Sequence, residues 1–306
     1  MFSTSIQIAF IVVLAFFFRF LKVFREGDEA VLNSYVYYVA LPSFLFLELN
    51  TMKFNALSMK IVVITLLSML IVVVLFWIIQ RIFRLDRRIF SILSLSSVFG
   101  STAFFGIPFV TFSYPQPEFL QLTALIASVS GVVGLSIVVV LLELEIAGKL
   151  AFKDLVRILL KRFARNPLII SILLGLTTNL AGIRLGGGIY KGLDMLGKST
   201  AVTAIFMLGL FLYGKKYRKI VSGLLLSLLR VVLVPIVTYV IARSFGLSGD
   251  VLNITVLLSA MPVAITMITI TQKYDFEKDL FANIVMVSSL SALVYLNLIR
   301  FILGVR

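Results

Sequence analysis

Two apolar stretches of the chain carry hydroxyl side chains beside a proline. The first, GSTAFFGIP, covers residues 100–108, and the second, SAMPVAIT, covers residues 259–266. Because proline lacks a backbone N–H and clashes with the preceding turn, an unbroken helix is not expected at either place. Backbone groups freed inside a bilayer must be buried in protein or line a cavity. Irregular backbone is therefore expected near residues 101–107 and 259–262, and the two breaks predict a polar site.

A helix that restarts after a break presents unpaired N–H groups and about half a unit of positive charge. The segments that follow Pro108 and Pro262 are expected to provide such ends. They would bind a small anion, such as a carboxylate, without the desolvation cost of a buried lysine. Carbonyl groups ahead of each break could bind a cation or the donors of a substrate.

Polar side chains gather around both breaks. Thr266, Thr269 and Gln272 share one helical face, because they follow one another at a spacing of three. The alternative is that such hydroxyls bond to their own helix and only soften a kink. Ser128 and Ser130 either face the same cavity or pack between helices. The predicted substrate-binding residues are Ser101, Thr102, Gly106, Ile107, Pro108, Ser130, Met261, Pro262, Thr266, Thr269 and Gln272.

The remaining chemistry of the chain is limited. The sequence has no histidine and no cysteine, so imidazole and thiolate groups are excluded as ligands, bases or nucleophiles. No metal site and no cofactor are expected, and neither GxSxG nor a pair of intramembrane aspartates suggests an enzyme. Arg230 lies within an apolar stretch, where a charge is functional by default. It is expected to pair with Glu143 or Glu145, or to snorkel.

Composition indicates the elements that must position these groups. Of the 306 residues, 60% are hydrophobic and 14% are charged, which predicts an all-α polytopic membrane protein without a soluble domain. The ten expected spans lie near residues 4–24, 31–50, 60–81, 89–114, 119–145, 165–183, 195–213, 220–243, 251–272 and 280–303.

The net charge of +14 is a signal of topology and does not indicate a nucleic-acid partner. Nineteen of the 28 lysines and arginines lie in alternate loops, those after spans 1, 3, 5, 7 and 9. The positive-inside rule puts these loops in the cytoplasm and both termini outside the cell membrane.

Five spans per half force the two halves into opposite orientations, which predicts an inverted repeat. The expected parts are a first repeat at 1–145, a connector at 146–164 and a second repeat at 165–306. The connector alternates apolar and basic residues. It is either an amphipathic interfacial helix or a solvated connector with snorkelling bases.

Several short motifs resemble the auxin efflux carrier family, and they occur in the right order over nearly the whole chain. They are the run 38–46 (YVALPSFLF), Gly106-Ile107-Pro108, the run 166–170 (NPLII), Leu193 with Met195-Leu196-Gly197, Met207-Leu208-Gly209, Arg230 with Pro235, Met261-Pro262-Val263-Ala264 and Lys273-Tyr274.

This resemblance implies a ten-span fold related to that of bile-acid and sodium/proton carriers, with crossed helices 4 and 9. It also implies a scaffold of spans 1, 2, 6 and 7, a moving domain of spans 3–5 and 8–10, a homodimer and an organic-anion substrate. Members of that family commonly carry asparagine where Ser101 stands, which argues against auxin itself as the substrate.

The sequence thus predicts a secondary transporter of a small organic anion that works by an elevator-like movement of one domain against the other. A coupling proton or sodium ion is left open. The alternative is an anion- or solute-conducting channel with the same crossed helices. A channel would give currents far above carrier turnover and no counterflow.

Overall fold

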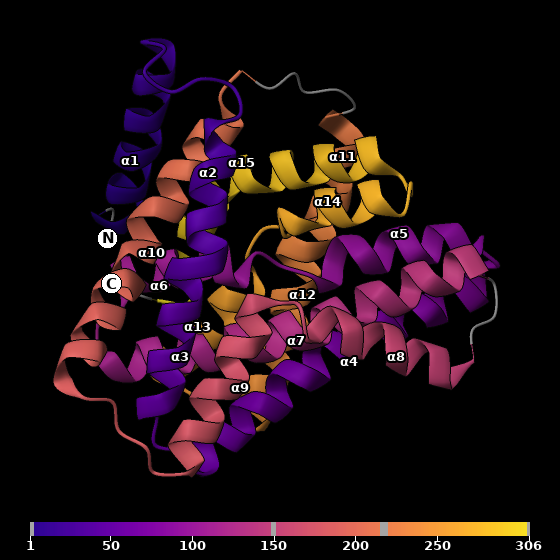
Figure 1. The fold of residues 1–306 in the computed structure, drawn as a ribbon. Helices are drawn as coiled ribbons and strands as arrows, with labels where there is room; N and C mark the ends of the chain where they lie inside the picture. Colours follow the sequence, from indigo (N-terminus) through magenta and orange to yellow (C-terminus); the bar gives the residue numbers. More distant parts are fainter. Residues whose placement is uncertain (1–2, 148–150, 215–219, 305–306) are drawn as a thin grey trace. The chain divides into compact units, whose positions relative to one another are not determined.

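The computed structural model describes residues 3–147, 151–214 and 220–304, and nearly all of them are helical (Figure 1). Within these ranges no strand forms, and the one pairing of extended backbone is an isolated antiparallel bridge between Gly100 and Val263. The predicted all-α class is confirmed. Some of the predicted loop and terminal residues lie outside the described ranges, namely Lys149, Leu150, Lys215, Lys216, Arg218, Lys219 and Arg306.

Each of the ten stretches expected to span a membrane contains helix, but not all are long spans. In the described part of the chain, five helical segments are long and apolar enough to cross a membrane. A sixth is obtained if the bent pair Lys278–Ala292 and Val294–Ile302 counts as one span. Shorter apolar helices cover four further stretches. The long segments are Asp28–Thr51, Ala56–Phe83, Pro117–Ile146, Gly187–Leu212 and Val221–Ser244.

In the described residues, three π-helical segments each lead directly into an α-helix, and each ends two residues before a proline. Pro42, Pro108 and Pro235 each occupy the first turn of the α-helix that follows. A proline ring clashes with the carbonyl four residues earlier, and that carbonyl lies inside the π segment in all three cases. The wider turn accommodates the ring, so the helix continues through each of these prolines. The segments are η1 (Val36–Ala40), η2 (Thr102–Gly106) and η3 (Leu229–Leu233).

The chain divides into two compact units. The first contains Met1–Ser58, Ala103–Ser128 and Arg162–Lys216, and the second contains Met59–Thr102, Val129–Lys161 and Tyr217–Arg306. In the first unit, α3 packs on α9 and α10, while α1 and α6 pack on α10 (Figure 1). Its helices are α1 (Ser3–Phe20), α2 (Asp28–Tyr35), α3 (Leu41–Thr51), α6 (Ile107–Ser113), α9 (Pro167–Leu180), α10 (Gly187–Leu212) and the first part of α7 (Pro117–Ala147).

A glycine lets α9 approach α3 closely. A Cβ atom at Gly175 would lie 2.8 Å from the carbonyl oxygen of Phe46, so no larger residue fits between these backbones. Farther along the pair, the buried Asn50 donates to Thr178 at 2.8 Å, and Asn179 donates to the carbonyl of Asn50 at 2.6 Å. Small residues and amide hydrogen bonds therefore hold the core of the first unit.

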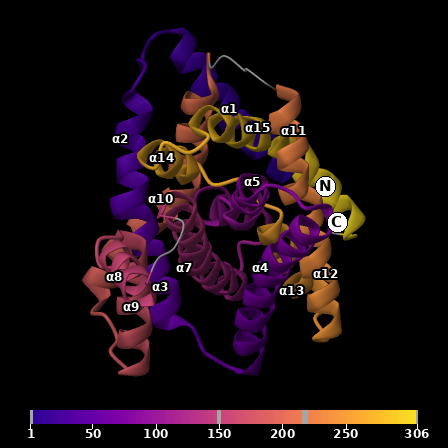
Figure 2. The same cartoon turned by 90° about the vertical axis from the view of Figure 1, so that its right-hand side faces the viewer.

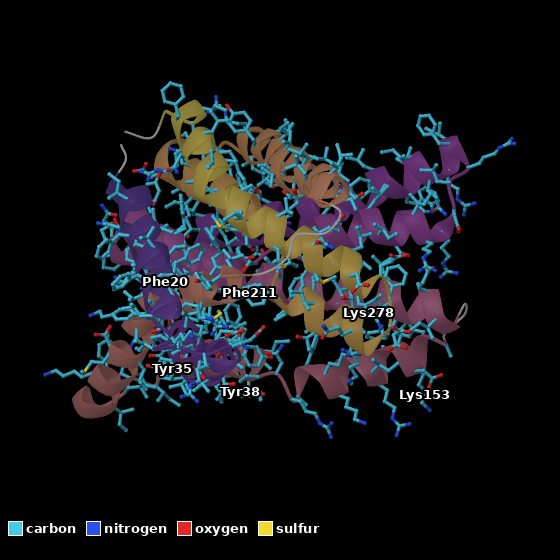
Figure 3. All side chains as sticks on the ribbon, turned by 90° about the horizontal axis from the view of Figure 1, so that it is seen from above. Phe20, Tyr35, Tyr38, Lys153, Phe211 and Lys278 are labelled. Carbon is cyan, nitrogen blue, oxygen red and sulfur yellow. The ribbon has the colours of Figure 1, made fainter. Side chains whose placement is uncertain are left out.

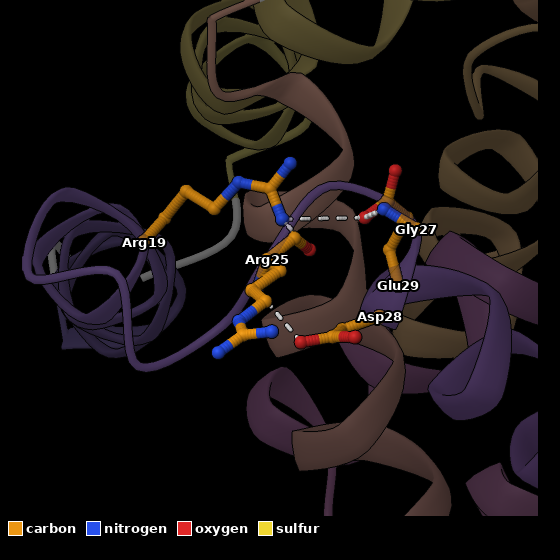
Figure 4. A network of polar contacts seen from close by, with 5 residues as sticks. All are labelled: Arg19, Arg25, Gly27, Asp28 and Glu29. Atoms are coloured by element: carbon orange, nitrogen blue, oxygen red, sulfur yellow. Dashed lines mark hydrogen bonds and ion pairs between the residues drawn. The ribbon is translucent and has the colours of Figure 1, made fainter.

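The loop between α1 and α2 is closed by its own charges (Figure 4). Arg19 forms an ion pair with Glu29 at 3.6 Å and also donates to the carbonyl of Arg25. The backbone N–H of Arg25 donates to Asp28 at 2.7 Å. Asp28 and Glu29 lie in the first turn of α2, where negative charge interacts favourably with the helix dipole.

In the second unit, α11 and α14 pack on α15, and α12 packs on α13 (Figure 2). Its core joins α5, α7, α14 and α15 through Leu95, Val138, Met267 and Phe281, each of which is fully buried. Its helices are α4 (Ala56–Phe83), α5 (Arg87–Val98), the second part of α7, α11 (Ile220–Leu228), α12 (Val234–Ser244), α13 (Gly249–Ser259), α14 (Thr266–Lys273) and α15 (Lys278–Ile302).

Helix α8 (Phe152–Phe163) occupies most of the expected connector, and none of its residues is buried. Its partly covered apolar residues, Leu155, Ile158, Leu159 and Phe163, recur at helical spacing along one face. The side chain of Lys153 projects away from the helix (Figure 3).

Candidate substrate-binding site at two broken helices

The two broken segments pair with each other inside the second unit. Helix α5 ends at Val98, and α13 ends at Ser259. Beyond these ends, the N–H of Ser101 donates to the carbonyl of Pro262 at 2.7 Å, and the N–H of Ala264 donates to the carbonyl of Phe99 at 3.0 Å. The two freed backbones thus satisfy each other, as irregular backbone within a membrane protein must.

The positions of both breaks differ from the expected ones. The first was expected at residues 101–107 because of Pro108, but the non-helical residues are Phe99–Ser101, and helix η2 begins at Thr102. Pro108 is not a helix breaker here, because the π turn ahead of it absorbs its ring. The second break, expected at residues 259–262, covers residues 260–265 and does contain Pro262.

Arg230 joins the two breaks. Its side chain is 4% exposed, and its Nε donates to the carbonyl of Met261 at 3.0 Å. Its Nη1 donates to the carbonyls of Ser97 at 2.6 Å and Val98 at 3.2 Å. The side chain therefore bonds to backbone on both sides of the crossing.

The expected pairing of Arg230 with a glutamate, or its snorkelling, is wrong. Glu143 accepts a hydrogen bond from the hydroxyl of Tyr274 at 2.5 Å, and Glu145 accepts one from Ser91 at 2.9 Å. The acceptors of Arg230 are backbone carbonyls at two helix ends, which substitute for a carboxylate.

The electrostatics of the crossing follow from these contacts. Ser97 and Val98 form the last turn of α5, and Met261 lies just beyond the end of α13. Each helix C-terminus carries about half a unit of negative charge, so the single charge of Arg230 balances both. At the opposite side, the N–H groups of Thr102 and Thr266, which begin η2 and α14, donate no hydrogen bond within the described residues. The positive helix ends therefore keep their partial charge.

Gly100 makes room for the guanidinium. A Cβ atom at this position would lie 1.9 Å from Nη2 and 2.5 Å from Cζ of Arg230. The requirement here is the close approach of a side chain to the backbone, and any residue other than glycine would occupy the place of the guanidinium.

Helix α15 fixes the second break from another direction. The hydroxyl of Tyr295 donates to the carbonyl of Ala260 at 3.0 Å, and the N–H of Val263 donates to the hydroxyl of Ser288 at 3.2 Å. Sequence reasoning missed Ser288, Tyr295 and Gly100 as parts of this site. A tyrosine in the middle of an apolar helix was the one signal available, since a buried tyrosine hydroxyl usually finds a partner.

The predicted site residues lie in four places. Ser101, Thr102, Met261 and Pro262 are buried at the crossing. On α14, Thr266 is partly buried, and Thr269 and Gln272 are exposed. Ser130 is partly buried on α7 in the second unit, and Ser128 donates to the carbonyl of Ala124 within its own helix. The fourth place is in the first unit, which contains Gly106, Ile107 and Pro108.

Two hydroxyls near the crossing are buried without a partner. Ser94 and Ser97 on α5 are both 0% exposed, and neither hydroxyl forms a hydrogen bond within the described residues. A buried polar group without a partner is uncommon in native proteins, so these two hydroxyls remain available as donors and acceptors beside the crossing.

Replacing Pro108 with alanine is expected to leave the protein folded and active. The helix already continues through this position, so the melting temperature should change by less than about 3 °C, which corresponds to about 1 kcal/mol. Pro262→Ala is the matched comparison, because it adds a buried N–H within the true break. It should lower the melting temperature by roughly 3–9 °C. Equal effects of the two substitutions would contradict this assignment of the breaks.

These features define a polytopic helical membrane protein in which two broken helices pair around a buried arginine. The sequence matches the family model described as Membrane transport protein over residues 1–300, so the chain belongs to this family. The chain is a transporter and not an enzyme. The predicted relationship to the auxin efflux carriers is confirmed.

Known relatives agree with this assignment. An uncharacterized transporter of Methanocaldococcus jannaschii is 24% identical over 301 residues, which are 96% of each chain. A probable auxin efflux carrier component 5c of rice, Oryza sativa subsp. japonica, is 28% identical over 151 residues. That alignment covers 47% of this chain and 40% of the rice protein. Component 5b of rice is 28% identical over 158 residues, which are 49% of this chain and 43% of the rice protein.

Proposed function

We propose that the chain is a secondary transporter of a small organic anion, with a carboxylate group bound at the paired breaks. The observation that carries this proposal is the position of Arg230 at the two C-terminal helix ends. Because it balances their negative charge, the N-terminal ends at Thr102 and Thr266 give the site a positive sign. A carboxylate would accept hydrogen bonds from these ends, beside Ser101 and the face of Thr266, Thr269 and Gln272.

We further propose ten spans in two inverted repeats, a homodimer and an elevator-like movement of one domain. The division of the chain into units supports the two domains. The first unit contains the expected spans 1, 2, 6 and 7 completely, and the second contains spans 3, 8, 9 and 10. Spans 4 and 5 are divided between the units, at Thr102/Ala103 and at Ser128/Val129. A covalent link at these two points would let one domain move while it stays attached.

The substrate is proposed to be a carboxylate other than auxin. The rice relatives are named as auxin efflux carriers, but Ser101 stands where family members commonly carry asparagine. Serine is shorter than asparagine and lacks the two amide donors. Ser101→Asn should therefore shift the preference among carboxylates while expression stays unchanged.

Uptake into proteoliposomes tests the proposal directly. A panel of labelled carboxylates would be offered with and without proton and sodium gradients. Single loss of the hydroxyl of Ser101 or Thr266 should weaken the apparent affinity roughly tenfold, and combined loss should do far more. Counterflow distinguishes a carrier from a channel. The proposed site is wrong if the carboxylate ranking is the same before and after Ser101→Asn.

We propose that the protein resides in the cell membrane with both termini outside. The motive is the gathering of nineteen basic residues in alternate loops. The chain has no native cysteine, so a single cysteine introduced at Arg84 can be labelled cleanly. It should react with an impermeant thiol reagent only after the membrane is opened, and a cysteine at Lys53 should react in intact cells. The opposite pattern would reverse the orientation.

A further inference from the structure

The first unit contains a cavity of about 60 Å³, and none of the residues that line it belongs to the paired breaks. Helices α3, α6 and α10 and the start of α7 form its wall. Most of the wall is apolar, but five of its side chains carry oxygen or nitrogen atoms. The lining residues are Phe44, Leu47, Glu48, Ile107, Thr111, Leu120, Asp194, Gly197, Lys198, Thr200 and Ala201. A cavity of this size has room for a few water molecules or for a small hydrated ion.

Glu48 is the charged residue of this cavity that has no partner. Asp194 is bound to Lys198 at 2.7 Å, one helical turn away on α10. Glu48 is partly buried and interacts electrostatically with both, but within the described residues it forms neither a hydrogen bond nor an ion pair. Since the charges of Asp194 and Lys198 cancel each other, the carboxylate of Glu48 would leave one uncompensated negative charge in the cavity. Such a charge is costly away from water unless a cation balances it.

A second polar group of the cavity also lacks a partner. Thr200 is 1% exposed, and its hydroxyl forms no hydrogen bond within the described part of the chain. Thr111 donates to the carbonyl of Ile107 at 2.8 Å, so its hydroxyl oxygen can still accept or coordinate. One carboxylate and two hydroxyl oxygens thus line the same space.

We propose that this cavity binds a single monovalent metal cation, such as Na⁺, through the carboxylate of Glu48 and the hydroxyls of Thr200 and Thr111. Oxygen ligands suit hard cations. Divalent ions usually gather several carboxylates, and the described residues contain no group of three acidic side chains that could hold a metal ion. The proposal concerns binding alone and holds whether or not the chain transports an organic anion.

The test measures thermal stability of the purified protein in detergent. Sodium chloride would replace choline chloride at constant ionic strength, and KCl and LiCl would follow in parallel. A ligand that binds only the folded state stabilises it, so saturating Na⁺ should raise the melting temperature by about 3 °C. Glu48→Gln should remove this shift. Thr200→Val should move the midpoint of the sodium dependence up about tenfold, and Thr200→Ser should restore it.

Glu145→Gln serves as the matched control, because this glutamate belongs to the second unit and binds Ser91. It should keep the full response to sodium. If Glu48→Gln does not yield folded protein, the Thr200 pair still tests the site. No response of the unmodified protein to any of the three metal cations would overturn the proposal. The same response in Glu48→Gln would also overturn it.

Discussion

Replacing Gly100 with alanine is expected to produce one of the two largest losses of stability in this protein. The new methyl group would lie 1.9 Å from Nη2 of Arg230, far inside contact distance. The guanidinium cannot withdraw without losing its hydrogen bonds to the carbonyls of Ser97, Val98 and Met261. Overpacking and broken charged hydrogen bonds together should cost about 3 kcal/mol or more. The melting temperature should fall by roughly 6–12 °C.

Gly131→Ala is the control for this experiment. Gly131 lies within α7, and a Cβ atom there would meet nothing within 4 Å. Alanine also favours helix by up to about 1 kcal/mol over glycine, so this variant should be as stable as the original protein or more so. If Gly100→Ala behaves like Gly131→Ala, Arg230 does not occupy the position described.

Removing Arg230 is expected to have the second large effect. Arg230→Leu leaves three carbonyls without their donor and two helix ends without a compensating charge. Each buried unsatisfied group costs about 1–3 kcal/mol, so the loss should exceed about 3 kcal/mol. Arg230→Lys keeps the charge, but an ammonium group is a point charge that cannot bridge both helix ends as a fork does. The stability of Arg230→Lys should lie between that of the original protein and that of Arg230→Leu. Melting temperature and anion uptake both measure the series.

The two substitutions should also be coupled. In a chain that already carries Arg230→Lys, the guanidinium is gone, and Gly100→Ala should cost much less than in the original protein. A double-mutant cycle should give a coupling energy of about 1–3 kcal/mol, the range found for residues in contact. Strictly additive costs would mean that the two residues do not meet.

The sequence was sufficient to locate both breaks to within a few residues, but it did not identify how they are joined. Pro262 was recognised correctly, because no π turn precedes it and the helix does end there. Pro108 was misread, since a sequence does not show whether a neighbouring turn can widen to accept the ring. Arg230 was recognised as functional, but its acceptors are backbone carbonyls, which have no signature in the sequence.

Contacts between distant residues explain the other gaps. Gly100 and Arg230 are far apart in the chain, and nothing in either local sequence indicates that one makes space for the other. Tyr295 and Ser288 reach the second break from α15, and the sequence does not show which of the polar residues of this helix face the break. In the sequence, Glu48 is an acidic residue near the end of the expected span 31–50, and nothing around it indicates a site. Asp194 pairs with Lys198 one turn away on its own helix, whereas the position of Glu48 beside this pair depends on how α3 packs on α10.

The π turns η1 and η3 each lie within a continuous helix, and this has a consequence for how the helix presents its side chains. A π turn amounts to one extra residue in an α-helix, and one residue corresponds to a rotation of about 100° around the axis. Side chains after Ala40 and Leu233 are therefore out of phase with those before Val36 and Leu229. A single helical wheel drawn through either of these helices would mix two faces. The two ends of each helix can thus present different faces to different neighbours.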